Sequence, residues 1–84
     1  SILRRVIHQP RFNILFHLRQ KTKVMLSITD ENGKTLLQED VTAQTISGDN
    51  KIEKHFKPFK VGGIYFVTIT AAGETATQKI IVKE

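Results

Sequence analysis

The chain contains no cysteine, no tryptophan and only two prolines among its 84 residues. Without cysteine, neither a disulfide nor a thiolate metal site can stabilise the fold. A domain of this size buries about 60–65% of the surface of its unfolded chain, which is enough for one small core. We therefore expect residues 1–84 to form a single domain that is held together by packing alone.

Long apolar runs are also missing. No run approaches the ~20 residues of a membrane-spanning helix, and no basic segment followed by an apolar stretch marks a signal peptide. The hydrophobic fraction of 39%, with five phenylalanines, is nevertheless too high for a disordered tail. The chain starts at Ser1 and its only methionine is Met25, so we expect a fragment or a processed product.

Side chains arranged for catalysis are scarce. The serines lie in no nucleophile motif, and the closest approach to a metal-ligand pair is Glu53 with His55, which suits an exposed strand face. The acid pairs Asp30–Glu31 and Glu39–Asp40 are adjacent, and neighbours on a strand point to opposite faces. The sequence therefore predicts a protein that is not an enzyme and has neither a cofactor nor a metal.

Acidic residues are absent from the first third of the chain. The net charge is +5 overall, whereas residues 30–84 carry seven lysines against eight acids. The candidate anion-binding residues are Arg4, Arg5, Arg11, Arg19, Lys21 and Lys23. No exposed row of aromatic rings and no RNA-binding motif accompanies them, which favours anionic lipopolysaccharide over nucleic acid. A face that only keeps the protein soluble is the simpler interpretation.

Apolar residues alternate with polar ones along most of the chain, which is typical of β-strands. Tyr65, Val67 and Ile69, for example, share one face of a strand. About seven strands predict an all-β, antiparallel immunoglobulin-like β-sandwich, with a small five-strand OB-like barrel as the alternative. The expected strands are Ile2–Ile7, Phe12–Leu18, Val24–Thr29, Lys34–Glu39, Lys51–Phe56, Ile64–Ala71 and Thr75–Val82.

Turn residues separate these strands. Asp30–Gly33 is typical of a hairpin in which Gly33 takes a positive φ, and residues 47–50 predict a second turn. Residues 41–45 extend the preceding strand or form a separate edge segment. Gly63 lets the chain enter the central strand sharply, and Tyr65 buries a ring whose hydroxyl needs a partner.

Three segments carry a family resemblance: Ile28–Lys34 followed by Leu36 and Leu37, Gly63–Ile69, and Thr77–Glu84. Together they resemble the C-terminal sorting domain of type IX secretion system (Por secretion) proteins of Bacteroidota, over about residues 12–84. The resemblance implies an immunoglobulin-like sandwich that directs an attached protein across the outer membrane by recognition.

The resemblance also implies partners and a location. The partners are translocon, shuttle or sortase proteins of the outer membrane, together with anionic lipopolysaccharide. The protein would be in the periplasm in transit and then at the outer membrane or cell surface. Translocon recognition would fall on Lys79, Ile80, Ile81, Val82, Lys83 and Glu84, with Gly33, Gly63 and Tyr65 as fold-determining residues.

The start of the chain departs from the family pattern. Members open with a Pro-Asn-Pro-like segment, of which residues 7–10 keep only Pro10. This leaves open a retained interaction module of the cell-surface sortase and attachment complex, which would bind a partner protein or lipopolysaccharide. A generic adhesin-type sandwich is a third reading. Ile2–Ile7 would pair either within the domain or with another copy of the chain. In the second case the protein would self-associate through an edge strand.

Overall fold

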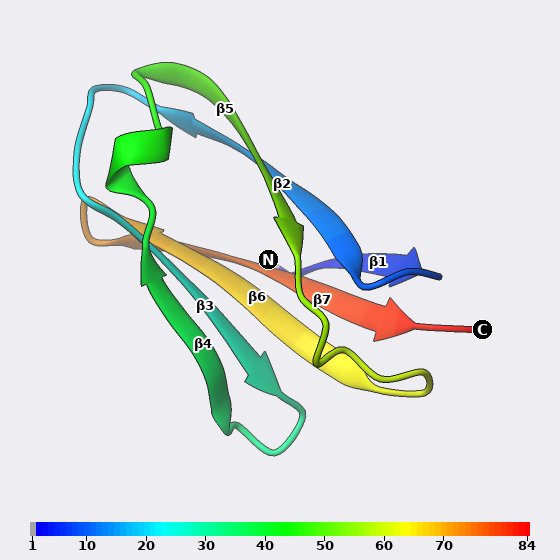
Figure 1. The fold of residues 1–84 in the computed structure, drawn as a ribbon. Coiled ribbons are helices and arrows are strands. Elements are labelled where there is room, and N and C mark those ends of the chain that lie inside the picture. Colours follow the sequence, from blue (N-terminus) through cyan, green and yellow to red (C-terminus); the bar gives the residue numbers. More distant parts are fainter. Residues whose placement is uncertain (1) are drawn as a thin grey trace.

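The computed structural model describes residues 2–84, with side chains from residue 3 onward. Seven strands and one 3₁₀ helix follow one another in this part of the chain (Figure 1). They are β1 (Ile2–Ile7), β2 (Arg11–Leu18), β3 (Val24–Asp30), β4 (Thr35–Asp40), η1 (Thr42–Gln44), β5 (Gly48–His55), β6 (Ile64–Ala71) and β7 (Glu74–Val82).

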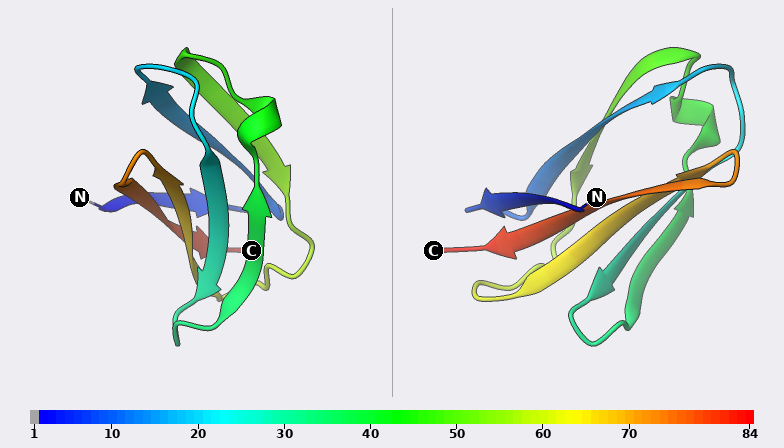
Figure 2. Two further views of the ribbon diagram at one scale, coloured as in Figure 1. Left: turned by 90° about the vertical axis from the view of Figure 1, so that its left-hand side faces the viewer. Right: turned by 180° about the vertical axis from the view of Figure 1, so that it is seen from behind.

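The strands form two sheets that pack face to face, as Figures 1 and 2 show. The larger sheet has the order β1-β7-β6-β3-β4, and the smaller sheet contains only β2 and β5. The predicted β-sandwich is confirmed, and residues 2–84 form no closed barrel. Every strand pair is antiparallel except β1 with β7, which run parallel from Ile2 beside Thr77 to Ile7 beside Val82.

The core lies between the two sheets and follows the alternation of the sequence. Leu26, Ile28 and Ile80 have no exposed surface. An aromatic cluster closes one end of the core: the Phe59 ring lies 4.5 Å from the Tyr65 ring and 5.7 Å from the Phe12 ring, centroid to centroid. The Phe12 side chain is buried. Truncating such a buried side chain to alanine costs about 2–5 kcal/mol of unfolding free energy.

The prediction of a turn at residues 47–50 was wrong, because β5 already begins at Gly48. The side chain of Asn50 explains the difference. Its Oδ1 accepts a hydrogen bond from the Ile46 amide at 2.8 Å, and its Nδ2 donates to the Ile46 carbonyl at 2.8 Å. The buried asparagine thereby satisfies the backbone of the bend before the strand, while its own backbone pairs with β2.

Residues 41–45 neither extend β4 nor form an edge strand, contrary to the prediction. They turn through η1, because the chain must cross from the larger sheet to the smaller one. Two bonds tie this crossing to the start of β3. The Val41 amide donates to the Val24 carbonyl, and the Val24 amide donates to Thr42 Oγ1, each at 2.9 Å.

The β6–β7 hairpin turns on two residues with positive φ, Ala72 at 51° and Gly73 at 77°. This is the pattern of a type I′ turn, whose right-handed twist matches the flanking strands. Alanine is a poor choice at the first position, since its Cβ makes a left-handed backbone costly.

We predict that Ala72→Asn raises the free energy of unfolding by about 0.5–1 kcal/mol, because asparagine tolerates this backbone region. Urea unfolding followed by circular dichroism measures the change. Ala43→Asn, at an exposed residue of η1 without positive φ, is the matched control and should shift stability by less than about 0.5 kcal/mol. Equal effects of the two substitutions would contradict the explanation.

Candidate recognition site

The last strand, which carries the predicted recognition residues, lies inside the larger sheet and not at its edge. β7 pairs with β1 on one side and β6 on the other. The bonding continues to the end of the strand: the Val82 amide donates to the Gly63 carbonyl at 3.1 Å, and the Lys83 amide donates to the Ile7 carbonyl at 2.8 Å. From Thr77 to Val82, both backbone edges of β7 are therefore occupied by residues of the domain itself.

Alternation along β7 divides the six predicted recognition residues into two groups. Ile80 and Val82 point into the core and are 0% and 4% exposed. Lys79 and Ile81 are half-buried on the outer face of the sheet, while Lys83 and Glu84 are exposed. A partner that binds the folded domain can therefore contact the side chains of Lys79, Ile81, Lys83 and Glu84, but not those of Ile80 and Val82.

The strand register brings further side chains to the outer face of β7. Arg4 of β1 stands beside Lys79 and Val6 beside Ile81. On the other side, Phe66 and Ile64 of β6 pair with Lys79 and Ile81. We call these six residues the outer β7 surface: Arg4, Val6, Ile64, Phe66, Lys79 and Ile81.

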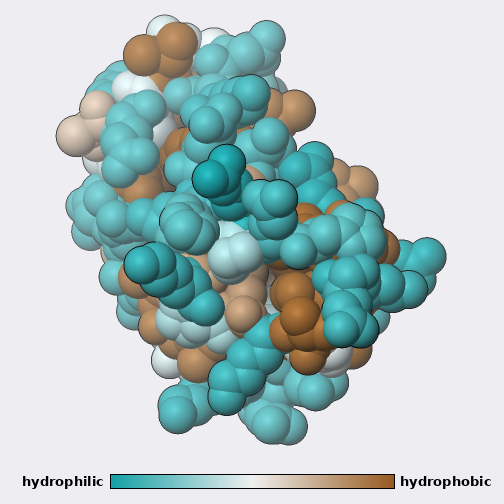
Figure 3. Space-filling view, turned by 45° about the vertical axis from the view of Figure 1, so that its right-hand side comes forward, coloured by the Kyte–Doolittle hydropathy of each residue, from teal (hydrophilic) through white to brown (hydrophobic). Residues whose placement is uncertain are grey.

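The outer β7 surface combines apolar side chains with cations. Val6 is 45% exposed. Seen from the side on which β7 ends, the molecule shows apolar patches bordered by hydrophilic side chains (Figure 3). Val6, Ile64 and Phe66 were not predicted as recognition residues, because they lie on strands far from the tail in the sequence. All three are apolar residues at positions that the alternation within their strands points outward. This pattern was the signal in the sequence that could have identified them.

Gly63 and Tyr65 support the end of β7 by close packing. The Lys60 amide donates a hydrogen bond to the Tyr65 hydroxyl at 3.0 Å, which gives the buried hydroxyl its partner. The Tyr65 ring lies directly over Gly63, where a Cβ would stand 2.6 Å from Tyr65 Cε2 and 2.9 Å from the Lys60 carbonyl oxygen. Gly63 is thus required by the ring above it, whereas the positive φ of this turn falls on Gly62, at 84°.

We predict that Gly63→Ala lowers the free energy of unfolding by about 1–3 kcal/mol, because the new methyl group overlaps the Tyr65 ring. Denaturant unfolding of four variants in a double-mutant cycle tests the cause. In a Tyr65→Leu background, the same substitution should cost less, since the ring is gone. Strictly additive effects would show that the ring is not the reason for the glycine.

Gly33 lies in the β3–β4 turn with φ at 85°. Asp30 Oδ1 accepts hydrogen bonds from the amides of Asn32 and Lys34, each at 2.9 Å. The aspartate therefore organises the bend, and the glycine supplies the left-handed residue that returns the chain into β4.

The six candidate anion-binding residues do not gather on one surface. Arg11 and Arg19 stand at opposite ends of β2, about 26 Å apart for eight residues of extended chain. Lys21 Nζ donates to the Thr42 carbonyl at 2.6 Å and also to the Thr45 carbonyl, so this ammonium is committed to the backbone around η1. Arg4 belongs to the outer β7 surface.

The charge of Lys23 acts on the nearby carboxyl of Asp40. The hydroxyl and the amide of Thr42 bond to the Asp40 carboxylate and, together with the charge of Lys23, hold the pKa of that carboxyl below its ordinary value.

Arg5 and Arg11 remain together, at a pocket of about 420 Å³ that Lys54, His55 and Glu53 also line. Arg5 Nη1 donates to Asn13 Oδ1 at 2.6 Å, which links β1 to β2. Two of the six candidate anion-binding residues therefore line one pocket.

Neither a metal centre nor a membrane span is found in the part of the chain that the structure describes. No group of three or more histidine and acidic side chains in residues 2–84 is placed to hold a metal ion. No helix there is long and apolar enough to cross a bilayer. A β-sandwich that presents a patterned outer surface is compatible with a recognition module, but the fold by itself does not assign that role.

Comparison with protein families identifies that module. The model of the secretion system C-terminal sorting domain matches residues 9–83, nearly the whole chain, and the chain belongs to this family. No curated protein and no solved structure matches it. The resemblance seen in the sequence is confirmed. The domain is a C-terminal sorting signal for type IX secretion, recognised by that secretion machinery. The signal implies export to the cell surface or outer membrane, and the family implies a non-catalytic role.

Proposed function

We propose that the secretion machinery docks the folded sandwich through the outer β7 surface, by recognition and without catalysis. The observation that carries this proposal is the pairing of Arg4 with Lys79 beside the apolar side chains of Val6 and Ile81. Two like charges at paired positions of neighbouring strands destabilise a sheet. A partner with acidic groups around an apolar contact would relieve this repulsion while it buries the apolar side chains.

The folded state of the tail supports docking of a surface over capture of an extended peptide. Ile80 and Val82 are core residues, and β7 has neighbours on both edges. The domain would fold in the periplasm, meet a translocon, shuttle or sortase protein of the outer membrane, and leave for the outer membrane or cell surface with its cargo. Deleting residues 79–84 is a poor test of this mechanism, because the deletion also removes part of the core.

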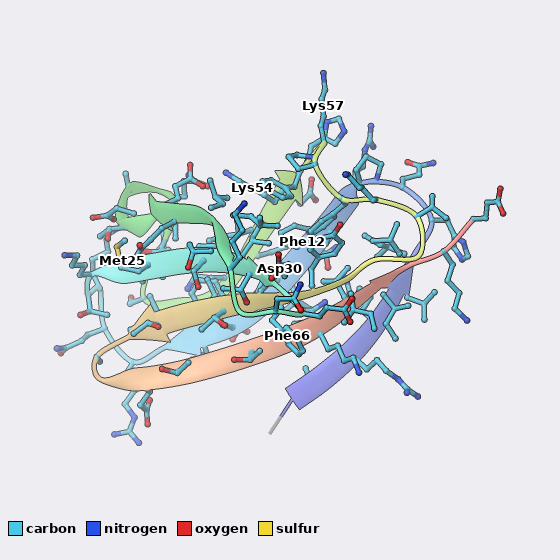
Figure 4. The ribbon with its side chains drawn as sticks, turned by 90° about the horizontal axis from the view of Figure 1, so that it is seen from below. Phe12, Met25, Asp30, Lys54, Lys57 and Phe66 are labelled. Carbon is cyan, nitrogen blue, oxygen red and sulfur yellow. The ribbon has the colours of Figure 1, made fainter. Side chains whose placement is uncertain are left out.

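Charge reversal on the surface is a sharper test. In a host with the type IX pathway, a periplasmic reporter fused to the domain should be exported about tenfold less when it carries Arg4→Glu with Lys79→Glu. A tenfold loss corresponds to about 1.4 kcal/mol of binding free energy. The matched control, Lys51→Glu with Lys57→Glu, makes the same change in net charge. Lys57 points away from the body of the molecule (Figure 4).

The control variant should be exported normally. Lys51 forms only an exposed ion pair with Glu53 at 3.2 Å, whose loss costs little stability. Equal export of both variants, with both folded by circular dichroism, would refute docking at the outer β7 surface. Equal loss in both would show that net charge matters and not this surface.

A second candidate is anion binding at the pocket between β1 and the start of β2. Arg5, Arg11, Lys54 and His55 line this pocket against the single acid Glu53. Lys54 also forms an ion pair with Glu39, so the arginines carry most of the uncompensated charge. We propose that a phosphate group of lipopolysaccharide is the anion, because arginine matches phosphate oxygens in a fork-like geometry.

Binding to lipopolysaccharide micelles tests this second candidate. We expect Arg11→Glu to weaken binding about tenfold, the effect of losing one charge-assisted contact of about 1.5 kcal/mol. Arg19→Glu changes the net charge equally at the other end of β2 and should have a smaller effect. If both variants lose affinity alike, or neither does, the pocket is not the binding site.

A further inference from the structure

The smaller sheet has an open edge along β2. Within residues 2–84, β2 pairs only with β5. The Phe56 amide donates to the Pro10 carbonyl at 2.7 Å, in register with the pairs that follow along β2. Residues of an antiparallel strand alternate between bonding to one neighbour and pointing away from it. The even-numbered residues of β2 therefore bond to β5, and the odd-numbered ones present their backbone to the other side.

The side chain of Arg5 marks this open side independently. Its Nη1 reaches the Asn13 carbonyl at 3.4 Å from β1, so the backbone of an odd-numbered residue does face away from β5. By the same alternation, the amide and carbonyl groups of Leu15 and His17 point to the open edge. The Leu15 side chain is 68% exposed. A short stretch of strand is therefore available for pairing.

A pocket lies next to this open stretch. The two sheets are close where β2 begins and diverge toward its end, in Figure 1 and in the right-hand view of Figure 2. The pocket between them has a volume of about 590 Å³. Its apolar lining comes from Phe16, Leu18, Ile69, Ala71 and Ala76. A strand added to β2 would place alternate side chains in this pocket and the others beside Leu15.

The charges around the open edge of β2 determine which charges an incoming strand should carry. Arg11 and Arg19 are exposed at the two ends of β2. The acids nearby are Asp49, which bonds to His17 at 2.9 Å, Glu53, which forms an ion pair with Lys51 at 3.2 Å, and Glu74, which lines the pocket. The exposed guanidinium groups of Arg11 and Arg19 can each pair with an acidic group of an incoming segment.

We propose that the open edge of β2 binds an extended segment of the secretion machinery, apolar at alternate positions and acidic at both ends, as a third strand of the smaller sheet. Main-chain hydrogen bonds to Leu15 and His17 supply the pairing, and the pocket selects the apolar side chains. This inference rests on the proposed docking of the folded domain, and it adds a second contact away from the outer β7 surface.

Proline substitution separates strand pairing from folding. Proline at position 15 removes an amide that faces the open edge and not the ladder to β5, so an edge strand accepts it. The probe is a synthetic heptapeptide with valine at alternate positions and aspartate at each end. We expect Leu15→Pro to weaken peptide binding at least about tenfold, whereas Leu15→Thr, which keeps the amide, changes it less than about threefold.

Nuclear magnetic resonance of the labelled domain identifies the edge. The amides of Leu15 and His17 should exchange quickly in the free protein and become protected with the peptide, while those of Ile14 and Phe16 are protected throughout. If Leu15→Pro fails to fold, His17→Pro serves the same purpose at the second open amide. Unchanged exchange at Leu15 and His17, or equal peptide affinity of the proline and threonine variants, overturns the proposal.

Export and oligomeric state distinguish the remaining outcomes. The reporter fused to the Leu15→Pro domain should be exported about tenfold less than the Leu15→Thr fusion. If the peptide binds the edge but export is unchanged, the secretion machinery is not the occupant and the proposal fails, whereas docking at the outer β7 surface still stands on its own charge-reversal test. A domain that dimerises through the β2 edge and excludes the peptide also overturns the proposal in favour of a second copy.

Discussion

β7 lies between β1 and β6, and backbone hydrogen bonds hold it on both edges to the end of the strand. Much of the remaining structure depends on this pairing. It places Ile80 and Val82 in the core and brings side chains of β1 and β6 beside Lys79 and Ile81. The Gly63–Tyr65 packing supports the same region, because the Gly63 carbonyl accepts the Val82 amide. A sorting signal built in this way is a property of the folded domain and not of its last residues alone.

β1 has a particular position in this arrangement. It lies before the residues that match the family model, which begin at residue 9, and it still completes the sheet beside β7. It pairs parallel, whereas all other pairs are antiparallel. The residues before the family match thus contribute Arg4 and Val6 to the outer β7 surface and cover an edge that would otherwise be open to other strands.

The unequal size of the two sheets has a functional consequence as well. Five strands on one side and two on the other leave part of the larger sheet without cover, which produces the pocket beside β2. The cations of the first third of the chain serve different purposes around this framework. Lys21 binds backbone carbonyls near η1 and Arg5 joins β1 to β2, while Arg11 and Arg19 stay exposed at the ends of the open strand.

Local patterns in the sequence were sufficient for the fold class, the family and most strand positions. Period-2 alternation located Ile64–Ala71 with the bounds that the structure shows, since one face of this strand is buried. The same patterns failed at residues 47–50, where a buried Asn50 replaces a turn, and at residues 41–45, where the chain changes sheets. In both places pairing with a distant segment, with β2 for residues 48–50 and with the start of β3 for residues 41 and 42, outweighs the local preference.

By itself, the sequence determined that the chain is a small all-β sorting domain whose excess of basic over acidic residues lies in its first third. Only the tertiary structure decided that the tail is an inner strand, that its neighbours Arg4 and Val6 share its surface, and that β2 keeps an open edge. The physical reason is that strand order and register arise from pairing between segments far apart in the chain. Alternation within one strand reveals which side chains share a face, but it does not reveal which strand lies next to it.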